Sequence, residues 1–164
     1  DLDSMTEAIS ILEAVDQLVP DREPVPQMYR MLVGARQTLL TRPSPLVVPA
    51  CLWKLLSSEG LRPQLDECVS CGESSDVEFI AFDLNLGGVV CRSCRSGVAI
   101  SALALELMRD VLGGKLGESL DRAFNPDGQQ LNDPVINEVS QLATRAFEHH
   151  IERRLRSVSI FERH

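Results

Sequence analysis

Four of the five cysteines in this 164-residue chain form two Cys-x-x-Cys pairs with nineteen residues between them. Cys68 and Cys71 make the first pair, and Cys91 and Cys94 make the second. Two intervening residues allow one tight turn to present both thiolates of a pair to a single ion, and the spacer is long enough for a hairpin that returns the second pair to the first. Structural Zn²⁺ takes four such ligands in a tetrahedron. The spacing therefore predicts one structural zinc ion, with no open position for a catalytic water.

Other uses of these cysteines fit the sequence less well. A thioredoxin-like redox centre places a single Cys-x-x-Cys at a helix start beside a βαβ pattern, which is missing here. An iron–sulfur cluster also takes four cysteines, but the symmetric hairpin spacing suits zinc better. Disulfides are rare in a reducing cytosol, and nothing in the sequence suggests export. Cys51, the fifth cysteine, lies in an apolar segment and is expected to be a small buried hydrophobe.

Three helices are predicted ahead of the cysteine segment. The first begins at Ser4 with a capping box and ends before Pro20. The second carries apolar residues at helical spacing over residues 28–39. The third covers residues 46–59 and ends at Gly60, because glycine suits the left-handed position that follows many helices.

The cysteine segment itself reads differently, and helices are predicted again after it. Residues 77–82 (VEFIAF) are typical of a strand, and residues 86–90 (LGGVV) of its hairpin partner. Ser101 is the expected N-cap of a helix that stops at a glycine pair. Asp133 as N-cap and Pro134 at the first helical position predict the start of the last long helix.

These elements predict a mainly α fold. Hydrophobic residues make up 44% of the chain and charged residues 24%, while aromatics reach only 4%, which favours helix packing over a β-sandwich. We expect a single helical, bundle-like domain over residues 1–164, with a four-cysteine zinc ribbon (a short β-hairpin) inserted at residues 66–97. The net charge of −8 argues against nucleic-acid binding by the whole surface, although a local basic patch can still bind it.

Several separated motifs resemble the RecO family of bacterial recombination mediators. They are the opening AISILEAVDQLVPDREPVPQMYRMLVGA, then EGLRPQLDECVSCG before the ribbon, LGGVVCRSC at its close, and HHIERRLRSVSIFE near the end. In that family a Gly-x-x-Pro-x-Leu-x-x-Cys-x-x-Cys-Gly segment leads into the ribbon, and a Leu-Arg-Ser-like segment follows the last long helix. The motifs recur in the right order over essentially the whole chain.

The resemblance implies a non-enzymatic role in DNA recombination and the repair of DNA damage. RecO proteins bind single- and double-stranded DNA, anneal complementary strands and help load RecA onto strands coated by single-stranded-DNA-binding protein (SSB). They work with RecR and recognise the acidic, Phe-ending tail of SSB. Because some members lack the cysteines, the zinc is implied to be a structural support.

The family also carries an N-terminal OB-fold, to which most of the DNA contacts would belong. This chain begins at Asp1 without an initiator Met, and we expect it to be a fragment that lacks that fold. The expected location is the bacterial cytoplasm, in association with the nucleoid. No membrane partner is expected, because no apolar run approaches the length of a membrane span. No small-molecule substrate is expected either.

An SSB tail requires an apolar pocket for its Phe and cations for its carboxylates. The resemblance places this site near the third helix, where Trp53 and Lys54 are candidates, although a lone Trp is more often a core residue than an anchor and Lys54 has the alternative of a solvated cation. The full set of predicted tail contacts is Trp53, Lys54, Arg153, Arg154 and Arg156.

Four further arginines are candidate contacts to nucleic acid: Arg62, Arg92, Arg95 and Arg145. Arg92 and Arg95 each follow a cysteine of the second pair, and Arg145 belongs to the basic cluster of the last helix. The alternative for that cluster is a solvated helix face, paired with Glu148 and Glu152.

Two rival functions remain to be weighed. An unrelated zinc-ribbon adaptor would bind only proteins and would have no affinity for DNA. A metal-dependent hydrolase would need an open metal position and a set of His or Asp ligands, which the sequence does not provide. His149 and His150 project about 100° apart on a helix and do not form a chelating pair. We therefore expect no enzymatic activity.

Overall fold

The computed structural model describes residues 26–41, 44–122 and 133–161 of the chain. The first predicted helix, over residues 4–19, lies outside this described part. The described elements are α2 (Pro26–Thr41), α3 (Val47–Ser58), β1 (Phe79–Asp83), β2 (Gly88–Cys91), the 3₁₀ helix η1 (Arg92–Cys94), β3 (Val98–Ala99), α4 (Ala102–Leu112), α5 (Leu116–Arg122) and α6 (Asp133–Phe161). The predicted fold class, mainly helical with a small four-cysteine β insert, is confirmed.

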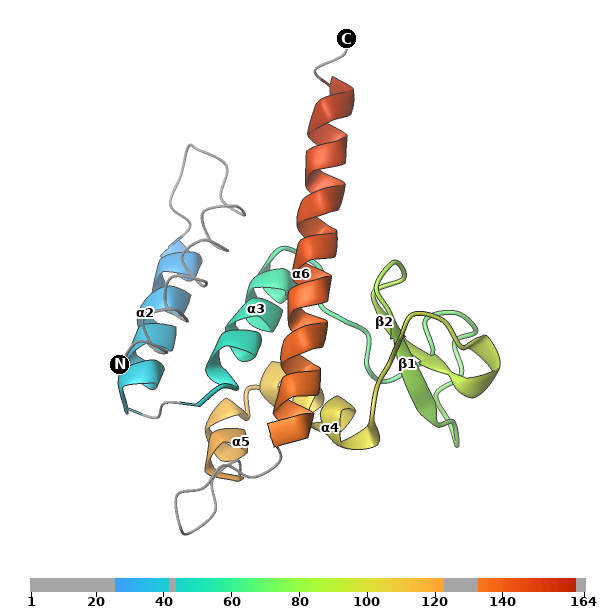
Figure 1. Ribbon diagram of the computed structural model, residues 1–164, viewed down its shortest axis with the longest axis horizontal. Coiled ribbons are helices and arrows are strands. Elements are labelled where there is room, and N and C mark those ends of the chain that lie inside the picture. Colours follow the sequence, from blue (N-terminus) through green and yellow to red (C-terminus); the bar gives the residue numbers. More distant parts are fainter. Residues whose placement is uncertain (1–25, 42–43, 123–132, 162–164) are drawn as a thin grey trace.

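The long helix α6 is the axis of the fold (Figure 1). It packs against α3 and α4, while α2 lies on the outer side of α3 and α5 packs against α4. The ribbon projects on the opposite side of α6 from α2. Within the described ranges, no helix combines the length and the hydropathy needed to cross a membrane.

The core forms around α3, which is buried along most of its length because its sequence is almost entirely apolar. Trp53 at its centre is 1% exposed. Its ring lies 5.9 Å from that of Phe82 in the ribbon, in a tilted arrangement. Phe82 and Val89 share one apolar cluster with residues of α3, α4 and α6. Burial of a large apolar side chain contributes about 1.5–3 kcal/mol, so these contacts fix the ribbon on the helical body.

The helix ends follow local signals in the sequence. Gly60, just after α3, has a φ of +81°, as the left-handed position after a helix requires. Ser101 caps α4 as predicted, because its side-chain oxygen accepts a hydrogen bond from the amide of Ala104. Glu138 of α6 then accepts hydrogen bonds from the amide and the hydroxyl of Ser101, at 2.6 and 2.8 Å. One carboxylate thus ties the start of α4 to α6.

Replacing Glu138 by Ala is expected to lower the free energy of unfolding by about 1–2 kcal/mol, since the cap of α4 loses its partner. Urea denaturation followed by circular dichroism measures this difference. Glu148→Ala, at an exposed position of the same helix, is the matched control and should change stability by less than about 0.5 kcal/mol. Equal effects of the two substitutions would show that the bridge to Ser101 does not stabilise the fold.

The ribbon is a three-stranded antiparallel sheet in the order β2-β1-β3. The predicted hairpin is confirmed, with Phe82 opposite Val89 and Asp83 opposite Gly88. The short strand β3 and the seven-residue helix α5 were not predicted from the sequence. Both are too short to show a hydrophobic period, and each is held by its neighbours in the fold.

The segment before the ribbon fastens it to the rest of the molecule. Gln64 exchanges backbone hydrogen bonds with Gly87 and Val89 across the hairpin. Arg109 of α4 donates to the carbonyl of Leu65 at 2.6 Å and pairs with the carboxylate of Asp66 at 3.2 Å. This segment is therefore bonded to the hairpin through the backbone of Gln64 and to α4 through Arg109.

Candidate metal centre and adjoining pocket

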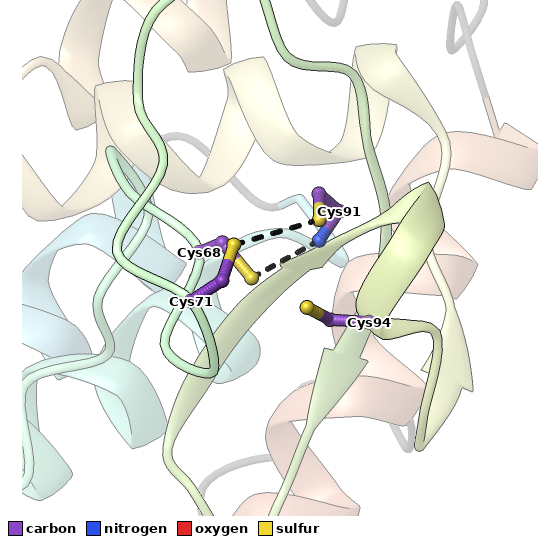
Figure 2. A group of neighbouring side chains, drawn as sticks. All are labelled: Cys68, Cys71, Cys91 and Cys94. Atoms are coloured by element: carbon purple, nitrogen blue, oxygen red, sulfur yellow. Dashed lines mark hydrogen bonds between the residues drawn. The ribbon is translucent and has the colours of Figure 1, made fainter.

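The structure brings the four predicted metal ligands together (Figure 2). Their sulfur atoms all lie within 4.8 Å of one another, and the Sγ atoms of Cys71 and Cys91 are 3.8 Å apart. Ligands on a tetrahedron with metal–sulfur bonds of about 2.3 Å are separated by about 3.8 Å. The donor set and its spacing therefore fit a tetrahedral thiolate site for a divalent cation.

Local backbone geometry explains why the first pair converges. Gly72 has a φ of +80°, which the turn after Cys71 requires, and its amide donates to the carbonyl of Cys68 at 2.8 Å. On the other side, the amide of Cys91 donates to the Cys68 sulfur at 3.4 Å. Amide donors of this kind stabilise a thiolate, so the backbone is arranged for charged sulfur.

The thiols differ in their tendency to ionise. Burial opposes the Cys68 thiolate, but the backbone amides of Cys91, Cys71 and Ser70 outweigh it and lower the pKa of Cys68 to about 6. For Cys71, the Glu73 amide favours the thiolate, but the Cys68 sulfur and burial oppose it, and the pKa of Cys71 is raised. A bound cation would stabilise all the thiolates at once, because it removes the repulsion between neighbouring sulfurs.

The outer end of the ribbon has little other support. Its own apolar cluster consists of Cys68, Ala81, Val90 and Cys91, with a few half-buried neighbours. All five cysteines of the chain are free in the structure, so no disulfide supports this end. A cluster of this size is too small to hold a fold by itself. A metal ion held by the four cysteines would therefore add substantially to the stability of this end of the ribbon.

At the other end, the hairpin turn is organised by Asp83. Its carboxylate accepts a hydrogen bond from the Ser96 hydroxyl at 2.6 Å and from the amides of Leu86 and Asn85, at 3.0 and 2.9 Å. The Ser96 hydroxyl and then the Leu86 amide lower the pKa of Asp83, against an opposing effect of burial. The charged carboxylate is therefore the form that holds the turn.

Because the pKa of Asp83 is lower in the folded chain, its contribution to stability is complete at neutral pH. That contribution falls below about pH 4, the ordinary value of a carboxyl, and vanishes as the pH passes the folded value. Asp83→Asn is expected to cost about 1–2 kcal/mol of unfolding free energy at pH 7 and progressively less in acid. Urea denaturation between pH 7 and pH 3 measures this; Asp76→Asn, at an exposed ribbon position, should have a small effect at every pH. A cost of Asp83→Asn that did not shrink in acid would contradict the assignment.

A cavity of about 250 Å³ lies where the ribbon meets the helices. We call it the junction pocket. Its walls come from the end of α3 and the linker after it, from the hairpin turn, and from α6. Its apolar lining includes Trp53, Leu56, Leu61, Phe82, Leu84 and Leu86. Leu61 and Leu86 are 40% and 55% exposed, so the pocket carries apolar surface to solvent.

Among the described residues, the ionisable side chains that line the junction pocket are two arginines and two histidines, which are positively charged when protonated: Arg62, Arg153, His149 and His150. No Asp or Glu of the described residues lines it, although the whole chain has 24 acidic residues against 16 Lys and Arg. A basic pocket in an acidic protein attracts anions selectively. Its chemistry therefore suits a ligand that combines an apolar group with negative charge.

The structure places two predicted tail contacts, Trp53 and Arg153, in the junction pocket together with Arg62, which was predicted as a DNA contact. Lys54 instead lines a separate cavity with Cys51 and Gly34. Arg156 forms an ion pair with Glu152, and the side chain of Arg154 lies outside the described residues.

The remaining predicted nucleic-acid contacts are not gathered into one site. Arg92 pairs with Glu78 at 2.8 Å on the ribbon surface, and Arg95 is exposed beside the metal centre. Arg145 is exposed on α6. Sequence reasoning missed Leu61 and Leu86 as site residues, because isolated leucines in turns carry no periodic signal. His149 was noted in the sequence but was not assigned to a site.

The fold and the four-cysteine cluster define the class of protein: a helical domain with a four-cysteine ribbon inserted in its middle. The family described as Recombination protein O C terminal matches residues 1–159. The chain therefore belongs to the RecO family.

Curated relatives agree with this family. The DNA repair protein RecO of Cutibacterium acnes is 33% identical over 172 residues, covering 99% of this chain and 65% of that protein. The protein of the same name from Frankia casuarinae is 31% identical, covering 96% of this chain and 63% of its own length. The one from Desulforamulus reducens is 25% identical, covering 99% and 62%. The chain thus spans less than two thirds of the length of these relatives.

Proposed function

We propose that this chain is the part of a recombination mediator that captures SSB, and that the junction pocket receives the acidic, Phe-ending tail of SSB. The observation that carries the proposal is the lining of that pocket, which among the described residues is apolar and basic and includes no Asp or Glu. In cooperation with RecR and DNA, the protein would promote strand annealing and the loading of RecA. Membership of a DNA repair family supports this role.

Different residues of the pocket would bind different parts of the tail. A Phe side chain would enter between Leu56, Phe82 and Leu84, where its burial contributes about 1.5–3 kcal/mol. The tail carboxylates would face Arg62 and Arg153, which add long-range attraction and fix the orientation. Together these terms are consistent with a dissociation constant in the micromolar range, about −8 kcal/mol.

The metal would have a structural role in this function. Cys68, Cys71, Cys91 and Cys94 would hold one Zn²⁺ and would fix the outer end of the hairpin whose turn forms a wall of the pocket. Because the protein supplies all four ligands, the ion would have no position for a catalytic water. We infer a binding protein without enzymatic activity, acting at the nucleoid in the bacterial cytoplasm.

DNA contacts of this chain would be weak and would come from exposed arginines such as Arg95 and Arg145. The overall charge of −8 opposes stronger binding of nucleic acid. An adaptor that binds only proteins is the second candidate, and the pairing of Arg92 with Glu78 favours it, since a paired arginine contributes less to phosphate binding.

Calorimetric titration of the zinc-loaded chain with a short acidic peptide ending in Phe tests the proposal. We expect saturable, salt-sensitive binding in the micromolar range, and no binding of a scrambled peptide. A folded, zinc-loaded chain that did not bind the peptide would rule out the junction pocket as the tail site. Fluorescence anisotropy with labelled single-stranded DNA separates the two candidates, because the adaptor would show no affinity for DNA.

A further inference from the structure

Nε1 of Trp53 and Nε2 of His149 are among the buried nitrogen atoms in the described part of the chain that have no hydrogen-bond partner. Trp53 is 1% exposed, so bulk solvent does not reach its indole N–H. Buried polar groups in folded proteins nearly always have a partner, because leaving one unpaired is costly. The two unpaired atoms therefore require an explanation.

Both residues line the junction pocket, and they reach it from different helices. Trp53 comes from α3 and His149 from α6. The indole N–H can only donate a hydrogen bond, and Nε2 of His149 donates in the imidazolium form or in the matching neutral tautomer. In either of those forms both atoms lack an acceptor, and no carboxylate of the described residues lines this pocket.

We propose that Trp53 and His149 determine the specificity of the junction pocket by donating hydrogen bonds to a carboxylate of the bound ligand. The inference rests on the proposed function, because it takes the ligand to be an acidic peptide that ends in Phe. Arg62 and Arg153 attract the negative charge, while the two N–H groups fix where one carboxylate lies. The nitrogens are closed to solvent without a ligand, so docking must move side chains at the mouth of the pocket, where Leu61 and Leu86 are exposed.

The chain has one tryptophan, which gives a direct reporter of this contact. Its indole N–H yields a single peak in a ¹H–¹⁵N spectrum of the zinc-loaded chain. The probes are the acidic Phe-ending peptide and N-acetylphenylalanine, a minimal aromatic carboxylate. We expect the indole peak to move downfield in proportion to occupancy with either probe.

Substitutions at His149 supply an independent measurement that leaves the core tryptophan in place. His149→Leu removes the donor and should weaken peptide binding about tenfold, whereas His149→Gln retains an N–H and should restore most of the affinity. Trp53→Phe, if folded by circular dichroism, should weaken binding of the carboxylate peptide more than that of the same peptide with an amidated C-terminus.

The outcomes separate this inference from the proposed function. Peptide binding with an unmoved indole peak and an unaffected His149→Leu variant would overturn the inference and leave the tail site standing. A peak that moves with N-acetylphenylalanine but not with the peptide would support the inference and contradict SSB-tail binding. If neither probe moves the peak, the inference is wrong.

Discussion

Serine in place of Cys91 is expected to abolish tight metal binding and to unfold the outer end of the ribbon while the helices remain. Cys91 is 3% exposed, ends β2, and donates its amide to the Cys68 sulfur. Binding of structural zinc contributes about 10–16 kcal/mol in small zinc domains, and a missing thiolate removes a large part of that. Atomic absorption should find about one zinc per wild-type chain and almost none in the variant after dialysis.

Cys51→Ser is the matched control for this loss. Burial raises the pKa of Cys51 to about 11, against a smaller opposing effect of Lys54, so this thiol stays protonated and is not a ligand. The control should keep its full zinc content. Near-normal zinc content in the Cys91→Ser variant, or equal losses in both variants, would contradict the four-cysteine centre.

Charge reversal in the junction pocket should have the largest effect on partner binding. Arg62 and Arg153 lie on the linker after α3 and on α6, and both line the pocket. Replacing both by Glu puts negative charge where we propose that the tail carboxylates bind, and like-charge contacts cost several kcal/mol. Affinity for the acidic peptide is expected to fall at least about 30-fold, equivalent to about 2 kcal/mol, as measured by calorimetric titration.

Lys54→Glu tests whether the tail binds beside Lys54, as the sequence suggested, or in the junction pocket. The sequence suggested Lys54 as a tail contact, but the side chain lines a different cavity from the junction pocket. Its reversal should change peptide affinity less than about threefold, through long-range charge alone. A large loss at Lys54 with little effect at Arg62 and Arg153 would move the partner site to the α2–α3 side of the molecule.

The metal centre could be predicted from the sequence because its geometry is local. Two residues between cysteines and a hairpin-length spacer leave few arrangements other than convergence on one ion. The cap at Ser101 and the end of α3 at Gly60 could also be predicted from the sequence, since each depends on a few neighbouring residues. The role of Glu138 in the same cap could not be predicted, because Glu138 lies in another helix, 37 residues along the chain from Ser101.

The junction pocket could not be predicted for a related reason. It is assembled from three segments that are distant in the chain, represented by Leu61, Leu86 and His149. Each of these residues is unremarkable within its own segment, and only packing of the ribbon against α3 and α6 brings them together. Trp53 illustrates the limit: it is a buried core residue that also lines the pocket, and its contact with a partner stays a prediction.

The central claim is that this chain recognises SSB through its tail, and binding to SSB-coated DNA tests it most directly. Single-stranded DNA is immobilised and coated either with intact SSB or with SSB lacking its acidic tail, and binding of the zinc-loaded chain is measured by surface plasmon resonance. We predict binding to the intact coat only, with loss of binding when Arg62 and Arg153 are both replaced by Glu. Equal binding to both coats would contradict the claim.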